Sequence, residues 1–88
     1  MKQQEINLIG QSTGKKIATR LIDFINSINS NRSAFERRCK ISNGYLNKLL
    51  VKGNSIGSKI LIRIKCQYPN LNVNWIITGE GNMIDDTF

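Results

Sequence analysis

The sequence predicts an all-α fold, a compact bundle of five helices. Two observations lead to this prediction. Apolar residues recur at helical spacing in successive segments, and only short runs of asparagine, glycine, serine or proline separate these segments. Because 88 residues can bury one small core, we expect one domain over residues 14–81. A flexible arm or a short edge strand should precede it over residues 1–13, and a tail should follow over 82–88.

The first two helices are predicted from one apolar stripe and one cap. From residue 13 or 14 to about residue 29, the stripe contains Ile17, Leu21, Phe24, Ile25 and Ile28. Asn31 can then cap a second helix over about 32–39, because its side-chain oxygen can accept a hydrogen bond from a free backbone N–H. That helix should bury Phe35 and Cys39.

The third helix should follow after a tight turn. Ile41 fills this turn, and Ser42 is the expected N-cap of a helix over about 43–51. Its buried face contains Leu46, Leu49 and Leu50. The polar run 52–55 ends it.

Two further short helices complete the prediction. The fourth, over about 58–67, carries Ile60, Leu61 and Ile64, and Pro69 prevents its continuation. Asn72 can cap a fifth helix that contains Val73, Trp75, Ile76 and Ile77, and the glycine-rich run 79–81 closes it. Trp75 could offer a flat surface to a ligand, but its helical spacing favours a place in the core.

Positive charge is concentrated in the middle of the chain. The formal net charge is +7, and nine bases lie between residues 31 and 65, opposed there only by Glu36. These bases are Arg32, Arg37, Arg38, Lys40, Lys48, Lys52, Lys59, Arg63 and Lys65. Such a block favours a polyanionic partner, because neutralised phosphates release counterions, although a solvated surface would give the same composition.

Several other classes of protein are disfavoured. No run of about 18 apolar residues could cross a membrane, and residues 1–16 lack a secretory apolar segment, so we expect a cytoplasmic protein. Cys39 and Cys66 have neither CxxC spacing nor histidine partners, which argues against a metal site and favours two small buried residues. The chain has no histidine and no credible carboxylate pair, so we expect neither an enzyme nor a cofactor nor a small-molecule substrate.

One segment near the N-terminus imitates a phosphate-binding loop. The run 10–15 begins with glycine and ends in Gly-Lys, as the loop GxxxxGK[ST] does. It is one residue too short, and Lys16 replaces the hydroxyl residue that would hold magnesium. No later strands could build the parallel sheet that such a loop needs, so a nucleotide-binding enzyme is a weak alternative.

The run 31–50 is the most specific feature of the chain. A short amphipathic helix, a tight turn and a helix that opens at Ser42-Asn43-Gly44-Tyr45 have the spacing of a helix-turn-helix. In that unit the second helix enters the DNA major groove. The sequence therefore predicts a DNA-binding domain, and with it a cytoplasmic protein that is associated with the nucleoid.

Two blocks of residues also resemble a known family. The first block contains Phe35-Glu36, Cys39 and Ile41-Ser42-Asn43-Gly44-Tyr45-Leu46. The second contains Tyr68-Pro69, Leu71-Asn72, Trp75-Ile76-Ile77-Thr78-Gly79-Glu80-Gly81 and Met83. From about residue 16 to 84 the chain resembles lambda-repressor-like helix-turn-helix domains, especially a phage-repressor and transcriptional-regulator branch in Bacteroidetes-type bacteria. The resemblance implies a five-helix fold and a transcriptional regulator, with a repressor as the usual case.

The chain departs from this family pattern at two places. The turn before the third helix usually carries glycine, whereas this chain has Lys40. Lys40 must adopt a left-handed conformation at a cost of about 1 kcal/mol or more, or the turn must differ. Family members also often continue into a C-terminal peptidase-like or oligomerisation domain, so self-cleavage and ligand control are not implied for this chain.

The third helix should read the bases. The candidate base contacts are Ser42, Asn43, Gly44, Tyr45, Asn47 and Lys48, and Val51 also lies outside the core face. Asparagine can pair with adenine, lysine can donate to guanine, and tyrosine can contact a thymine methyl or a phosphate. Gly44 either lets the backbone approach DNA closely or occupies a first turn in which glycine costs little.

Phosphate contacts should come from helix ends and flanking bases. The candidates are Asn31, Arg32, Lys52, Asn54, Ser55, Lys15 and Lys16. The family implies a homodimer on a palindromic operator of double-stranded DNA, with Ile76 or Ile77 exposed at a seam along the fifth helix.

A protein-interaction module is the main alternative function. A bundle of this fold could bind a protein partner, as an antitoxin or oligomerisation domain does, and retain only weak DNA binding. The exposed face of the third helix distinguishes the two, because only a DNA reader should lose specificity when Asn47 or Lys48 is truncated.

Overall fold

Five helices make up most of the described chain. The computed structural model describes the backbone of residues 2–85 and the side chains of residues 14–85. The helices are α1 (Lys2–Ser27), α2 (Arg32–Arg38), α3 (Tyr45–Lys52), α4 (Ser58–Gln67) and α5 (Val73–Thr78). The fold is therefore all-α, as the sequence predicts, and α4 occupies the predicted range.

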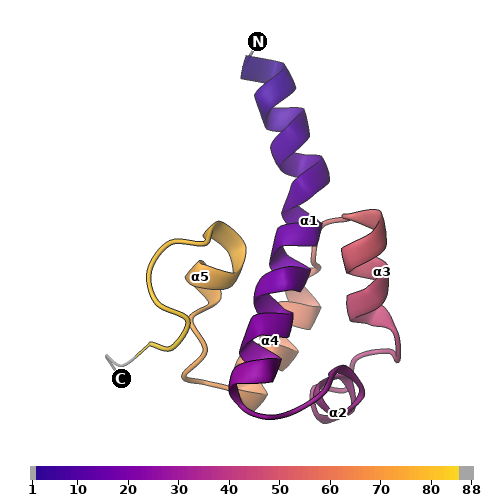
Figure 1. Cartoon of the computed structure of the whole chain (residues 1–88), viewed down its shortest axis with the longest axis vertical. Coiled ribbons are helices and arrows are strands. Elements are labelled where there is room, and N and C mark those ends of the chain that lie inside the picture. The colour runs from indigo at the N-terminus through magenta and orange to yellow at the C-terminus, as the bar shows by residue number, and fades with distance from the viewer. Residues whose placement is uncertain (1, 86–88) are drawn as a thin grey trace.

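Helix α1 is the longest element and the centre of the arrangement. It packs against both α3 and α5, which lie on either side of it in Figure 1. Its N-terminal half extends beyond the other helices. The prediction of an arm or an edge strand over 1–13 is thus wrong for the backbone of residues 2–13, which is helical. No proline interrupts residues 2–27, and each residue added to an existing helix gains a backbone hydrogen bond.

The core forms around the stripe of α1. Its fully or almost fully buried apolar residues are Ile17, Ala18, Leu21, Phe24, Ile25, Phe35, Cys39, Ile41, Leu46, Leu49, Ile64, Leu71 and Ile76. Ile28, predicted to belong to the stripe, is instead 40% exposed. Ile28 keeps helical spacing, because its N–H donates to the Phe24 carbonyl at 3.2 Å, but it lies one residue past the end of α1 and borders an open hollow beside Phe24 and Tyr68.

The two cysteines lie in different environments. Cys39 is buried, as predicted, but Cys66 is exposed, so the prediction of a buried Cys66 is wrong. Ile64 is the residue of α4 that enters the core. Cys66 stands two residues later, about 200° around the helix, and therefore faces away from it.

The chain after α5 packs back onto the domain. Leu71 forms an isolated antiparallel bridge with Ile84, and the Asn72 N–H donates to the Met83 carbonyl at 2.9 Å. Met83 and Ile84 also pack against the core, as does the partly buried Trp75. Residues 82–85 therefore belong to the packed domain and not to the predicted tail. Residues 86–88 lie outside the described part of the chain.

Within residues 2–85, no helix combines the length and the apolar character that a membrane crossing requires.

Candidate nucleic-acid interface

Asn31 caps α2 in the predicted way. Its backbone is extended, and its side-chain Oδ1 accepts a hydrogen bond from the Ala34 N–H at 2.8 Å. This satisfies one of the free N–H groups in the first turn of the helix. The next residue, Arg32, is exposed at the same end of α2.

The turn between α2 and α3 is built around Lys40. Its φ of 58° is left-handed, so the first of the two sequence-based alternatives is correct. The Ile41 N–H donates to the Glu36 carbonyl at 2.8 Å, and the Lys40 N–H donates to that of Arg37 at 3.2 Å. This is the hydrogen-bond pattern of a Schellman cap. Arg63 of α4 holds the turn from outside by donating to the Lys40 carbonyl at 2.9 Å.

Helix α3 begins two residues later than predicted. Gly44, at a φ of 87°, is the N-cap and lies outside the first helical turn. Ser42, the predicted cap, contributes only its backbone carbonyl, which accepts from the Tyr45 N–H at 3.1 Å. A Cβ at Gly44 would meet no protein atom within 4 Å, so the backbone conformation requires glycine here and internal packing does not.

Glu36 supplies the cap that Ser42 was expected to provide. Its carboxylate is buried, with the residue 3% exposed, yet it belongs to α2. Oε1 accepts from the Gly44 N–H at 3.0 Å, and Oε2 accepts from the Leu46 N–H at 2.9 Å. The positive end of a helix dipole favours an anion at this place. The only signal in the sequence was that Glu36 is the single acid among the bases of residues 31–65.

One face of α3 is left open to solvent. We call it the exposed α3 face, and it consists of Gly44, Asn47, Lys48, Val51 and Lys52. Leu46 and Leu49 point the opposite way into the core. The exposed α3 face therefore offers an amide, two ammonium groups and one branched apolar side chain, and its single bare segment of backbone lies at Gly44.

The candidate base contacts divide by exposure. Ser42, Asn43, Gly44, Asn47 and Lys48 are all exposed, and the structure gathers them on the N-terminal side of α3 and along its open face. Tyr45 is only partly exposed, because its side chain packs against the core. A hollow of about 400 Å³ separates α2 from the start of α3 and is lined by Ser33, Glu36, Arg37, Ile41 and Asn43.

The candidate phosphate contacts lie in separate parts of the structure. Lys52 ends α3, and Asn54 and Ser55 are exposed in the connection that follows. This connection touches α1, where a Cβ on Gly14 would overlap the Asn54 carbonyl oxygen. The structure thus brings these residues next to the exposed α3 face.

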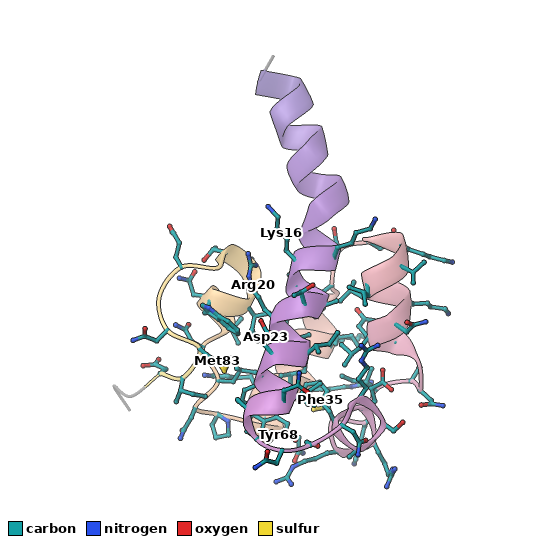
Figure 2. The ribbon with its side chains drawn as sticks, in the orientation of Figure 1. Lys16, Arg20, Asp23, Phe35, Tyr68 and Met83 are labelled. Carbon is teal, nitrogen blue, oxygen red and sulfur yellow. The ribbon has the colours of Figure 1, made fainter. Side chains whose placement is uncertain are left out.

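Lys16 does not join them. It lies one helical turn before Arg20, whose guanidinium donates to the carbonyls of Ile76 (2.8 Å) and Ile77 (3.2 Å) in α5. Figure 2 shows Lys16 leaving α1 on the side away from α3. Lys15 and Lys16 are both exposed and line a shallow hollow with Thr19 and Arg20.

Adjacent arginines of α2 have different surroundings. The Arg38 guanidinium carbon lies 5.3 Å from the ring centre of Tyr68, as in a cation–π contact. Tyr68 stacks on Phe35 at 5.5 Å and meets Phe24 edge-on at 5.1 Å. Arg37 instead borders the hollow beside α3.

Burial raises the pKa of the Cys39 thiol to about 11, and the positive charge of Arg38 partly opposes this shift. Burial likewise raises the pKa of Tyr68.

The exposed charges of residues 31–65 all have the same sign. Eight of the nine bases in residues 31–65 are exposed, and Lys65 is partly buried. The only acid of that segment, Glu36, is buried, with a backbone N–H on each oxygen. The α2–α3 unit therefore presents cations and neutral polar groups to solvent and exposes no acidic side chain.

Comparison of the chain with protein-family models, with curated proteins and with solved structures gave no match.

Proposed function

We propose that this protein is a sequence-specific double-stranded DNA-binding regulator of transcription. In this proposal α2 and α3 form a helix-turn-helix of the lambda-repressor-like kind, and α3 enters the major groove. The observation that carries the proposal is the composition of the exposed α3 face. An amide and two cations stand on it beside a bare glycine, and the surrounding segment exposes no acid.

The proposed roles follow from the chemistry of each group. Asn47 can pair with the N6 and N7 atoms of adenine, and Lys48 can donate to O6 or N7 of guanine. Ser42 and Asn43 precede α3 and would meet neighbouring base edges. Arg32, Lys52 and the exposed connection after α3 would contact phosphates and set the position of the domain on the duplex.

The experiment that tests the proposal is selection of bound sites from a random duplex library at about 150 mM salt, followed by sequencing. Enrichment of a defined motif is the expected result. Binding without an enriched motif would leave only charge-driven association and would overturn the proposal.

We further propose a homodimer on a palindromic site, acting as a repressor of the phage type. Of the two α5 residues expected at a seam, Ile76 is fully buried and Ile77 is 40% exposed, so Ile77 is the residue available to a second copy. Two reading helices related by a two-fold axis require half-sites about one helical turn apart. Sedimentation with and without the selected duplex tests this, and a 1:1 complex at high micromolar protein concentration would contradict it.

A further inference from the structure

Val51 stands out among the apolar residues of α3. Its side chain is 64% exposed, the largest exposure among the large hydrophobic residues of the described chain that are open to solvent. Leu46 and Leu49 of the same helix are 0% and 4% exposed. Val51 therefore contributes little to the core, and as a β-branched residue it has a lower helix propensity than a leucine or alanine would.

The neighbours of Val51 indicate what could cover it. Asn47 lies four residues before it and Lys48 three, so all three side chains share one face of α3. Lys52 is the next residue and lies on the same side of Val51 as Lys48, with Asn47 on the other side. A patch in which two cations and an amide flank one branched apolar side chain does not suit an apolar protein surface, whereas it suits a polyanion that offers a small apolar group.

Duplex DNA has one such group in its major groove. Thymine carries a C5-methyl there, and the other three unmodified bases present only hydrogen-bonding atoms or C–H edges. Val51 is about 6 Å further along α3 than Asn47, which corresponds to about two base-pair steps of about 3.4 Å. The two residues can thus address neighbouring but different base pairs.

We propose that Val51 is a specificity-determining residue that contacts the C5-methyl group of a thymine in each half-site. This inference rests on the proposed function and adds one base identity to it. The thymine lies one or two base pairs from the pair that Asn47 reads, on the side toward the C-terminal end of α3. The contact is apolar, so it selects thymine without a hydrogen bond.

The test replaces each thymine of the selected duplex by deoxyuridine, one position at a time. Uracil keeps every hydrogen-bonding atom of thymine and lacks only the methyl group. For the unaltered protein, one position in each half-site should weaken binding about three- to tenfold, as expected for loss of a buried methyl. In Val51→Ala the same replacement should have a clearly smaller effect, because the two Cγ methyl groups that contact the thymine methyl are gone.

Ile62→Ala is the matched control. Ile62 is 61% exposed and β-branched like Val51, but it lies on α4. This variant should respond to uracil as the unaltered protein does. The exposure of Val51 makes Val51→Ala a safe substitution for folding, which circular dichroism can check.

The possible failures are distinct. If no thymine position responds to uracil, or if the response is the same in Val51→Ala, the assignment of Val51 is overturned while the proposed function stands. If library selection yields no motif, the proposed function fails and the assignment fails with it.

Discussion

The carboxylate of Glu36, on α2, accepts a hydrogen bond from the backbone N–H of Leu46, on α3, at 2.9 Å. The two residues are ten positions apart, and both are buried. This bond, with its companion to the Gly44 N–H, joins the two helices through the backbone of the second. These two bonds therefore fix the N-terminal end of α3 relative to α2, and this is the end from which α3 presents its polar residues.

Replacing Glu36 by glutamine should destabilise the fold. The amide can accept at one oxygen only, and its NH₂ group would face a backbone N–H, which leaves a buried donor unsatisfied. We expect a loss of about 1–3 kcal/mol in the free energy of unfolding, measured by urea titration. Glu80→Gln makes the same change of charge at an exposed residue and should stay within about 0.5 kcal/mol of the original. Equal stabilities of the two variants would contradict the capping role of Glu36.

Alanine at Gly44 should be costly for a different reason. The φ of 87° at Gly44 lies in the region that residues with a Cβ rarely adopt, although the space around it is open. We expect Gly44→Ala to lose about 1–2 kcal/mol in thermal or urea unfolding. Gly57 is the control, because its space is equally open while its φ is −78°. Both glycines are N-caps, where alanine is disfavoured, so Gly57→Ala should also lose some stability but clearly less than Gly44→Ala. A loss as large as that at Gly44 would mean that φ is not the cause.

Truncation of the exposed α3 face should separate DNA reading from protein binding. Asn47→Ala and Lys48→Ala remove side chains that are exposed, so both variants should keep the unfolding midpoint of the unaltered protein. Each should lower affinity for the selected duplex about five- to 100-fold relative to unrelated duplex, as expected when one base contact is lost. Asn26→Ala, at an exposed asparagine of α1, should bind normally. Unchanged specificity in both α3 variants would favour the protein-interaction module.

Stability should fall at high pH because of Cys39. Burial raises the pKa of its thiol from 9.0 to about 11, so the folded chain holds this proton more tightly than the unfolded chain does. The corresponding stability, on the order of 2 kcal/mol, is fully present below about pH 9 and is lost as the pH rises through about 11. Urea unfolding at about pH 8 and about pH 11 measures the change.

Other groups also titrate in this range, so the informative quantity is a difference between variants. Cys39→Ala should lose less stability between the two pH values than the unaltered protein loses. Cys66→Ala removes an exposed thiol and should behave like the unaltered protein. If Cys39→Ala and Cys66→Ala show the same pH dependence, burial of the Cys39 thiol does not contribute to it.

Local sequence was sufficient for several elements. Helix α4 runs from Ser58 to Gln67, as its apolar spacing predicts, and Asn31 and Asn72 cap α2 and α5 with their own side chains. The left-handed conformation of Lys40 was one of the two possibilities that the sequence allowed, the other being a different turn. These features depend on residues within one or two turns of each other, so hydrophobic periodicity and capping chemistry can reveal them.

Such local patterns cannot predict contacts between residues that are far apart in the sequence. Arg20 reaches the carbonyls of α5 across 56 residues, and residues 83–85 pair with 70–72 across α5. The carboxylate of Glu36 replaced Ser42 as the cap of α3 because folding buries it beside that helix end. The exposure of Cys66 depends on which face of α4 meets the core, and that of Ile28 depends on where α1 ends.

Sequence patterns alone predict the all-α class, the succession of helices, the basic middle of the chain and the polar residues of the α2–α3 unit. The packing of the helices was needed to show which of these groups share a surface, that the acid among the bases of residues 31–65 is buried, and that Val51 is exposed beside Asn47 and Lys48. The physical reason is that helix formation follows from neighbours along the chain, whereas burial and the sharing of a surface follow from how separate helices pack around one core.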